Sequence, residues 1–476
     1  MDKNSRLPAS LFLLFLLILF VISRVGYLNL PFYWDEAWSY AVAVLDMHKN
    51  GPFILPGDGN PELTRGHPLL FYFLSASWTR VFGTSLVMVH LFSLMISVLL
   101  LAAVYFVAAD LFDQATAYAA TLLFALQSIF LAQSTLLLPE VMLALWSLLT
   151  TFAYFRRKWA LFAVFSVLLV MTKETGMVLI GMLFLDKILL ERIFNKGQRR
   201  PTPLLLREIA MMSIPVMVFA VFIILQKIRS GWFLYPEHLD LAILDPHEII
   251  NRIRVFLSKL LFLQGRNIFF ISALAALAYG IFNRSIEKHM AHLLLFSAVF
   301  IMLYVTFSSV NFFTVRYLLS VFPFFIIPGT WLITVPFKKN WLKAAIVCAF
   351  ALLFGFYALK GSRNEQDTSL GIKNTVLLQK EAVNFAEEMH WQEKSIYTAF
   401  LMQYYLSIPD LGYLNNKAHP FTDISNAAGK DYEIFVFCSN EKDPLHEGVK
   451  NNSDFLLVKR FERKGAWVEF YKLSPW

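Results

Sequence analysis

A series of apolar segments separated by short polar turns constrains this chain more than any other feature. The segments cover residues 11–23, 86–109, 117–132, 141–155, 159–171, 177–185, 209–225, 268–281, 293–307, 318–335 and 342–359. Hydrophobic residues make up 57% of the sequence and charged residues only 16%, compared with about 25% in ordinary soluble domains. Such a composition has too little polar surface to cover a soluble globule of this size. We therefore expect a multi-pass α-helical membrane protein with about eleven transmembrane helices.

The first apolar segment is interpreted as an uncleaved membrane anchor. It follows Lys3 and Arg6, as the core of a signal peptide would, but Arg24 and the bulky Tyr27 come after it in place of a small-residue cleavage site. Several other segments are shorter than the ~20 residues that a span requires and must include polar or interfacial flanks. Segment 177–185 is the shortest of them.

The positions of the basic residues predict the orientation. If the N-terminus is cytoplasmic, basic clusters fall on the inner side in nearly every short loop, as the positive-inside rule requires. These inner residues are Arg156, Arg157 and Lys158; Arg192, Lys196, Arg199 and Arg200; Arg284 and Lys288; and Lys338, Lys339 and Lys343. The outer side then receives the loops 24–85 and 227–266 and everything after residue 360.

The C-terminal part of the chain has a different pattern. Segments 395–400, 432–438 and 455–471 are typical of strands, and a Lys464-Gly465 turn within the last of them predicts a hairpin. Segments 381–390 and 401–407 are typical of helices. We therefore divide the chain into a membrane domain, residues 1–360, and a small soluble α/β domain on the outer side, residues 361–476.

Polar residues are costly in and beside a membrane, so those at the outer ends of the predicted spans are candidates for function. Each has an alternative explanation when it is taken alone: solvated acids in an aromatic belt, a helix-capping carboxylate, or a cation that reaches the lipid headgroups. All of them fall on one face of the membrane, and carboxylates gathered with cations suggest a site that activates a hydroxyl and binds a phosphate. The candidates are Asp35 and Glu36, Arg65 and His67, Glu140, Lys173, and Arg316 with Tyr317.

The order of these residues along the chain resembles that of a known group of proteins. The ordered series Asp35-Glu36, then Gly66-His67-Pro68-Leu69, an acid at the head of the fourth span, Thr172-Lys173, and Arg316-Tyr317-Leu318 with Pro323 looks like the GT-C membrane glycosyltransferases. The protein O-mannosyltransferases and the lipid A aminoarabinose transferases are the most similar groups. The resemblance covers the membrane region to about residue 360, and the tail matches only in being an outer α/β domain.

Two positions depart from the pattern of these groups. The acid of the fourth span is usually Asp and is Glu140 here, which moves the carboxylate by about a methylene. The residue before the proline is Lys in some relatives and His67 here, so the charge at this position depends on pH.

The resemblance implies an inverting transfer of a sugar from a polyprenyl-phosphate donor to an acceptor hydroxyl on the outer face of the membrane. Asp35 would then be the base that removes the acceptor proton. Lys173, Arg316, His67 and Tyr317 would bind the donor phosphate, because the phosphate leaving group requires positive charge rather than protonation. Glu36 and Glu140 would orient the substrate or hold a divalent metal cation.

The outer segment 232–254 is either an interfacial lid over the lipid or a plain amphipathic connector. Its Tyr235, Glu237 and His238, together with Arg65, are candidates for closing the lid or contacting the acceptor. The expected partners are the donor lipid, an acceptor glycolipid, glycan or protein, and the bilayer, with no nucleic acid.

Two other functions are compatible with the sequence. A transporter or flippase of a lipid-linked sugar would place its charges near the middle of the bilayer and contain repeats, and neither is visible. A non-catalytic envelope assembly protein would not need the intact Asp35-Glu36 pair. By analogy with the bacterial members we expect a bacterial inner membrane location, with the N-terminus cytoplasmic and the C-terminal domain periplasmic or extracellular.

Overall fold

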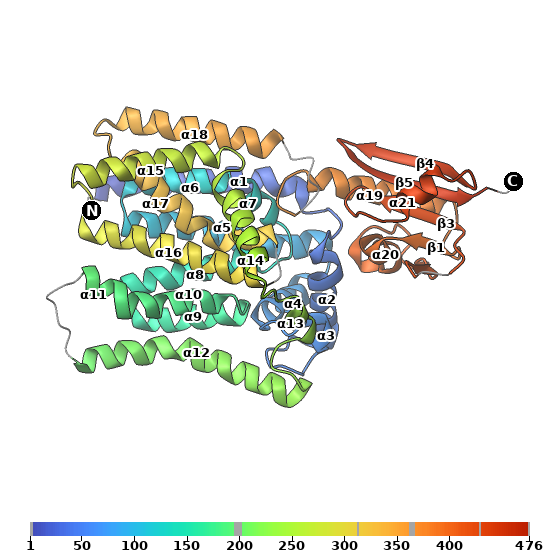
Figure 1. The fold of residues 1–476 in the computed structure, drawn as a ribbon, viewed down its shortest axis with the longest axis horizontal. Coiled ribbons are helices and arrows are strands. Elements are labelled where there is room, and N and C mark those ends of the chain that lie inside the picture. Colours follow the sequence, from blue (N-terminus) through green and yellow to red (C-terminus); the bar gives the residue numbers. More distant parts are fainter. Residues whose placement is uncertain (1–2, 195–201, 312–313, 361–366, 428–429, 475–476) are drawn as a thin grey trace.

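The computed structural model describes residues 3–194, 202–311, 314–360, 367–427 and 430–474. It consists of a bundle of roughly aligned helices with a small sheet at one end, and the N-terminus lies at the other end (Figure 1). The predicted inner residues Lys196, Arg199 and Arg200 lie outside the described residues. On which side of a membrane each end lies therefore stays a prediction.

Each of the eleven apolar segments lies in one helix or in two consecutive helical elements. These helices are α1 (Lys3–Arg24), α5 (Leu86–Leu111), α6 (Gln114–Ala125), α7 (Ser128–Gln133), α8 (Glu140–Phe155), α9 (Trp159–Thr172), α10 (Gly176–Leu185), α12 (Thr202–Ser230), α15 (Arg266–Phe282), α16 (Lys288–Val310), the 3₁₀ segment η4 (Val315–Val321) with α17 (Phe322–Thr334), and α18 (Asn340–Lys360). In the described residues, six helices are long and apolar enough to cross a membrane, or seven if a bent pair counts as one span. A membrane-spanning helical bundle is thus confirmed, and the count of eleven spans stays a prediction.

The bent pair consists of α14 (Pro246–Leu261) and α15, which meet at 88°. The buried guanidinium of Arg266 fixes the bend, because its Nε donates to the Leu260 carbonyl at 2.7 Å and its Nη2 to the Lys259 carbonyl at 2.6 Å. Both carbonyls belong to the last turn of α14, where the helix dipole favours a cation. The 227–266 segment is therefore not a plain loop, since it contains α13 (Pro236–Asp240) and α14.

The first outer segment, residues 24–85, is also largely helical rather than an open loop. Its helices are α2 (Ala41–Asn50), α3 (Pro61–Thr64) and α4 (Leu70–Phe82), preceded by the 3₁₀ turn η1 (Val25–Tyr27) and a π-helix, η2 (Glu36–Tyr40). Short amphipathic helices of this kind bury one face against each other and leave no run long enough to signal a span. They lie with α13 at the end of the bundle that carries the sheet (Figure 1).

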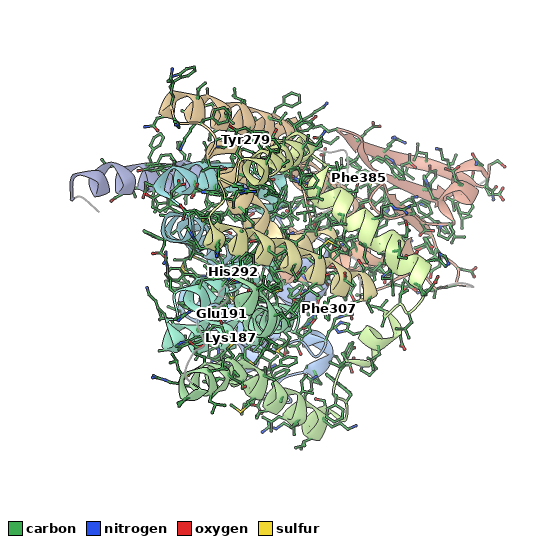
Figure 2. All side chains as sticks on the ribbon, turned by 60° about the vertical axis from the view of Figure 1, so that its left-hand side comes forward. Lys187, Glu191, Tyr279, His292, Phe307 and Phe385 are labelled. Atoms are coloured by element: carbon green, nitrogen blue, oxygen red, sulfur yellow. The ribbon has the colours of Figure 1, made fainter. Side chains whose placement is uncertain are left out.

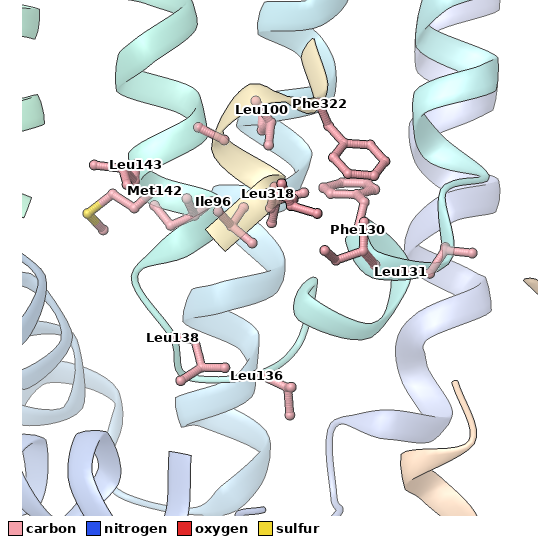
Figure 3. Packing of buried hydrophobic residues seen from close by; sticks show 14 of the residues in the cluster. Ile96, Leu100, Phe130, Leu131, Leu136, Leu138, Met142, Leu143, Leu318 and Phe322 are labelled. Atoms are coloured by element: carbon pink, nitrogen blue, oxygen red, sulfur yellow. The ribbon is translucent and has the colours of Figure 1, made fainter. Parts of the chain in front are cut away.

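The core of the bundle holds the segments that carry the polar site. Ile96 and Leu100 of α5 and Met142 and Leu143 of α8 lie beside Leu318 of η4 (Figure 3). Phe130 of α7 and Phe322 of α17 close the same core. This packing keeps η4 in a fixed position against α8, although η4 is not a regular α-helix.

The C-terminal sheet has five strands in the order β2-β1-β3-β5-β4. The strands are β1 (Ile396–Thr398), β2 (Ile424–Ser425), β3 (Ile434–Cys438), β4 (Phe455–Arg463) and β5 (Ala466–Leu473), with helices α19 (Ile372–Glu388), α20 (Phe400–Ser407) and α21 (His446–Asn451) and the 3₁₀ turn η5 (Pro409–Leu411). β2, β1 and β3 pair in parallel, whereas β5 pairs antiparallel with both β3 and β4. The strand and helix predictions and the Lys464-Gly465 hairpin are confirmed, and β2 and α21 are additions.

The sheet domain contacts the first outer segment directly. The Phe32 amide donates to the Leu411 carbonyl at 3.0 Å, and the Trp34 amide donates to the Tyr405 hydroxyl at 3.3 Å. The residues just before Asp35 thus contact the C-terminal domain directly.

A second charged cluster lies at the opposite end of the bundle, where Figure 2 shows Lys187 and Glu191 near His292. Lys187 pairs with Glu191 at 2.9 Å, and His292 Nε2 lies 2.6 Å from the Asp186 carboxylate. The tyrosine hydroxyl of Tyr154 donates to the same carboxylate at 2.7 Å. These contacts join α8, the π-helical segment η3 (Asp186–Leu190) that follows α10, and α16, far from the outer-end residues.

Candidate functional site

The Asp35 carboxylate lies where the π-helix η2 begins, and two groups hold it. Its Oδ1 accepts a hydrogen bond from Trp38 Nε1 at 2.7 Å, and its Oδ2 forms an ion pair with the Arg316 guanidinium. A π-turn places side chains out of the normal helical register, which allows Trp38 to reach back to Asp35. At 14% exposure, the Asp35 side chain is more open to solvent than Arg316, at 3%.

Arg316 is surrounded by carboxylates. Besides Asp35, its Nε donates to Glu140 Oε1 at 3.3 Å, and its Nη1 donates to Asp367 Oδ2 at 3.0 Å. These contacts engage Nε and Nη1, which carry three of the five N–H donors of the guanidinium, and the three carboxylates outnumber its single positive charge. The geometry of Arg316 fits the orientation of Asp35, and its role as a phosphate ligand stays a prediction.

Asp367 was not among the predicted site residues. It is a single acid in the polar segment that follows α18, and no motif or spacing distinguishes it in the sequence. Burial raises the pKa of its carboxyl to about 6, because the opposing effect of Arg316 only partly offsets the loss of solvent. Its backbone carbonyl also accepts a hydrogen bond from Gln133 Nε2 at 2.7 Å, which ties the start of the C-terminal part to α7.

Lys173 and Glu140 form a buried ion pair beside Arg316. Lys173 Nζ lies 3.0 Å from Glu140 Oε1 and 4.1 Å from the centre of the Tyr317 ring. The same Glu140 oxygen serves Lys173 and Arg316, while its buried Oε2 has no hydrogen-bond partner in the described part of the chain. Lys173 has a single carboxylate within ion-pair distance among these residues, so its positive charge is less fully compensated than that of Arg316, which faces three.

A tight reversal between α9 and α10 places Lys173. The chain turns within three residues, and Gly176 begins the next helix. A Cβ at Gly176 would lie 2.9 Å from the Leu169 carbonyl oxygen, so a side chain would force the two helices apart.

Glu36 faces away from this group and is fully buried. Its Oε1 accepts hydrogen bonds from His90 Nε2 at 3.0 Å and the Leu137 amide at 2.6 Å, and its Oε2 accepts one from the Tyr33 amide at 3.2 Å. His90 Nδ1 lies 2.9 Å from the Leu28 carbonyl, so both ring nitrogens face acceptors and both must donate. A protonated His90 therefore neutralises Glu36. This arrangement does not fit the predicted role of Glu36 in orienting substrate, and sequence reasoning missed His90 because it lies inside an apolar segment.

His67 forms a second pair near Lys173. Its Nδ1 lies 2.9 Å from Glu174 Oε2, and its ring stacks on Tyr40 with centroids 6.5 Å apart. Burial raises the pKa of Glu174, but His67 and then Lys173 outweigh it and lower the pKa to about 2. The His238 ring lies 5.0 Å from His67, and burial followed by the neighbouring His67 lowers the His238 pKa to about 4.

Three of the four lid candidates, Tyr235, Glu237 and His238, contact the first outer segment, to which the fourth, Arg65, belongs. Arg65 pairs with Glu237 at 3.2 Å, and its guanidinium lies 4.0 Å from the centre of the Trp38 ring. The Tyr235 hydroxyl donates to Glu62 at 3.0 Å. Together with the contact between His238 and His67, these interactions hold α13 over the residues around Asp35.

The predicted metal-binding pair does not fit a shared cation. In the described ranges, no group of three or more His, Cys, Asp or Glu side chains is arranged to hold a metal ion. Both Glu36 oxygens accept hydrogen bonds from protein groups, and Glu140 is paired with two cationic side chains. We therefore derive no step through a metal at Glu36 and Glu140.

Comparisons with known proteins agree with this architecture. Residues 66–219 match the family described as dolichyl-phosphate-mannose-protein mannosyltransferase. ArnT from Cupriavidus metallidurans in the apo state superposes with a TM-score of 0.58 at 13% identity, and the match covers 98% of each chain. This chain has the GT-C fold of membrane glycosyltransferases.

Two further GT-C structures carry lipid phosphates. ArnT from Cupriavidus metallidurans bound to undecaprenyl phosphate matches with a TM-score of 0.55 at 13% identity, again over 98% of each chain. The archaeal oligosaccharyltransferase AglB from Archaeoglobus fulgidus, in complex with an inhibitory peptide and a dolichol-phosphate, matches with a TM-score of 0.55 at 12% identity. That match covers 92% of this chain and 70% of AglB. Comparison with curated protein sequences gives no significant match.

The family match covers only part of the candidate site. It includes His67, Glu140 and Lys173, and it leaves out Asp35 and Arg316. The structural match to ArnT covers 98% of the chain.

Proposed function

We propose that this protein is an inverting glycosyltransferase that moves a sugar from a polyprenyl-phosphate donor to an acceptor hydroxyl at the outer face of a membrane. The observation that carries the proposal is the Asp35 carboxylate, oriented by Arg316 and Trp38 and partly open to solvent, beside the buried Lys173. The reaction requires a base that removes the acceptor proton and a cation that stabilises the leaving phosphate, and one end of this GT-C bundle carries both. The lipid phosphates in the ArnT and AglB structures support a donor of this class.

The transfer is a single displacement at the anomeric carbon. The acceptor oxygen forms a bond to that carbon as the bond to the phosphate oxygen breaks, and the configuration inverts. The acceptor proton moves to Asp35, and the polyprenyl phosphate leaves as a monoester whose charge Lys173 stabilises. Arg316 holds Asp35 in place, and Glu140 links Arg316 to Lys173, so that the base and the phosphate site keep a fixed separation.

The lid is part of the same proposal. Arg65, Glu237, Tyr235 and His238 join α13 to the first outer segment beside Asp35. Opening these contacts would admit the donor lipid, and closing them would exclude water from the reacting centre. The acceptor would be a glycolipid, a glycan or a protein, and the location that this chemistry favours is a bacterial inner membrane with the sheet domain outside.

A comparison of cells tests the proposal. Envelope lipids, glycans and secreted proteins would be analysed by mass spectrometry in strains with the gene deleted and restored. We expect one sugar to be missing from one acceptor after deletion and to return with the gene. An unchanged set of glycans, with a lipid-linked sugar crossing the membrane at a different rate, would instead indicate a transporter.

The role of Lys173 is tested by binding. Lys173→Ala should weaken the retention of undecaprenyl phosphate by about tenfold or more, since a hydrogen bond to a charged group contributes about 1.5–3 kcal/mol. Native mass spectrometry of the purified protein measures this retention. Lys173→Arg should preserve most of it, and Lys49→Ala, which removes an exposed lysine that is also near the outer end, is the control. An equal loss of donor and acceptor binding in Lys173→Ala would contradict the assigned role.

A further inference from the structure

A large basic cleft separates the helical bundle from the C-terminal sheet, away from the residues around Asp35. Its volume is about 1110 Å³. It lies at the end of the bundle where α1 and α18 approach α19 and the sheet (Figure 1). The cleft is lined by η1, the end of α18, the start of α19 and the β4–β5 turn. Its lining residues include Tyr27, Leu359, Lys360, Lys373 and Lys464.

The three lining lysines have no carboxylate partner in the part of the chain that the structure describes. Within the described ranges, Lys360, Lys373 and Lys464 form no ion pair, and the one acidic lining residue, Glu462, pairs with Arg460 at 3.0 Å. Lys373 instead lies 5.1 Å from the centre of the Tyr27 ring. Positive charges that line one cleft repel each other, and an anion in the cleft would relieve that repulsion.

The position of the cleft relative to the bilayer points to the nature of this anion. The candidate span formed by α18 ends at Lys360, which lines the cleft, and the first candidate span ends at Tyr27, which also lines it. Leu359, one residue before Lys360, is 83% exposed and so faces lipid. The cleft thus lies at the level where helices leave the hydrocarbon and meet the headgroups.

We propose that this cleft binds the phosphate headgroup of an anionic lipid from the surrounding leaflet, which holds the sheet domain against the membrane surface. The three lysines would contact the phosphate, and Leu359 and Tyr27 would lie against the glycerol and the first part of the acyl chains. None of the lining residues belongs to the group around Asp35, so this lipid is distinct from the sugar donor. Lipid binding in the cleft therefore does not depend on the proposed transferase activity.

The test compares lipid retention by the full-length protein. Wild type would be reconstituted in mixtures of phosphatidylglycerol and phosphatidylcholine, extracted in detergent and examined by native mass spectrometry for the lipid that remains bound. We expect wild type to retain phosphatidylglycerol in preference to phosphatidylcholine. The triple variant Lys360→Gln, Lys373→Gln and Lys464→Gln should retain it at least about tenfold less well, since each lysine near a membrane surface adds to the attraction of anionic lipid.

Two controls separate the cleft from general surface charge. The variant Lys417→Gln, Lys442→Gln and Lys450→Gln removes the same charge from exposed positions outside the cleft and should retain lipid like wild type. Replacing the three cleft lysines by arginine should also preserve retention. Equal losses in the two glutamine triples, or no lipid preference in wild type, would overturn the proposal. Displacement of the lipid by inorganic phosphate would show a site for a free anion instead.

Discussion

The variant Asp35→Asn should lose sugar transfer while it remains folded and continues to bind the donor lipid. Asparagine has nearly the same shape, and its Oδ1 can still accept the hydrogen bond from Trp38. It cannot accept the acceptor proton at neutral pH, and loss of a general base typically costs about 10²–10⁴-fold in rate. Arg316 keeps its contacts with Glu140 and Asp367, so the surrounding structure should persist.

The measurement is product formed per amount of protein in the membrane, with the acceptor that mass spectrometry identifies. Trp38→Phe is the matched control, because it removes the hydrogen bond to Asp35 and leaves the charge; it should reduce the rate far less. Retention of undecaprenyl phosphate by Asp35→Asn should equal that of wild type. Transfer within a few-fold of wild type in this variant would eliminate Asp35 as the base.

The variant Glu36→Ala should destabilise the fold strongly. Glu36 and His90 are both buried and are the charged partners of one pair, with the Leu137 and Tyr33 amides also donating to the carboxylate. Removing one partner of a buried ion pair leaves an uncompensated charge and costs about 3–5 kcal/mol. The physical effect is on folding and not on the chemical step, because no Glu36 oxygen is free to reach a substrate.

Thermal unfolding in detergent and the yield of monodisperse protein measure this effect. Glu462→Ala, which removes one partner of an exposed pair with Arg460, is the control and should change stability by less than about 1 kcal/mol. The double variant Glu36→Ala with His90→Ala should be more stable than the sum of the single losses predicts, since both charges are then absent. A Glu36→Ala variant that is stable but inactive would contradict this structural role and indicate that Glu36 contacts the substrate.

The site residues divide according to how well the sequence predicted them. Asp35, Glu140, Lys173 and Arg316 were expected from their positions at the outer ends of apolar segments, and the structure brings these four together. The sequence did not predict the role of each residue equally well, because it does not show which charges pair. Arg316 is engaged by three carboxylates, while Lys173 has one.

Two other residues that form ion pairs with the site residues could not be predicted from the sequence. His90 lies within an uninterrupted apolar segment, and Asp367 follows α18 in an ordinary polar stretch. Each becomes significant only through a partner distant in the chain, Glu36 in one case and Arg316 in the other. The lid residues were expected from their side of the membrane, but their specific contacts with Arg65, Glu62 and His67 depend on the fold.

The sequence by itself determined the helical bundle and the C-terminal sheet, because hydrophobic length and the alternation of strand residues are local properties of the chain. It also determined the candidate acids and bases, since a charged residue beside an apolar segment is costly wherever it occurs. Tertiary structure alone decided the helices within the first outer segment, the pairing of Glu36 with His90, and the binding of Arg316 by Asp35, Glu140 and Asp367. These features depend on the distances between segments that are far apart in the chain, and ion pairs and hydrogen bonds are effective only over a few ångströms.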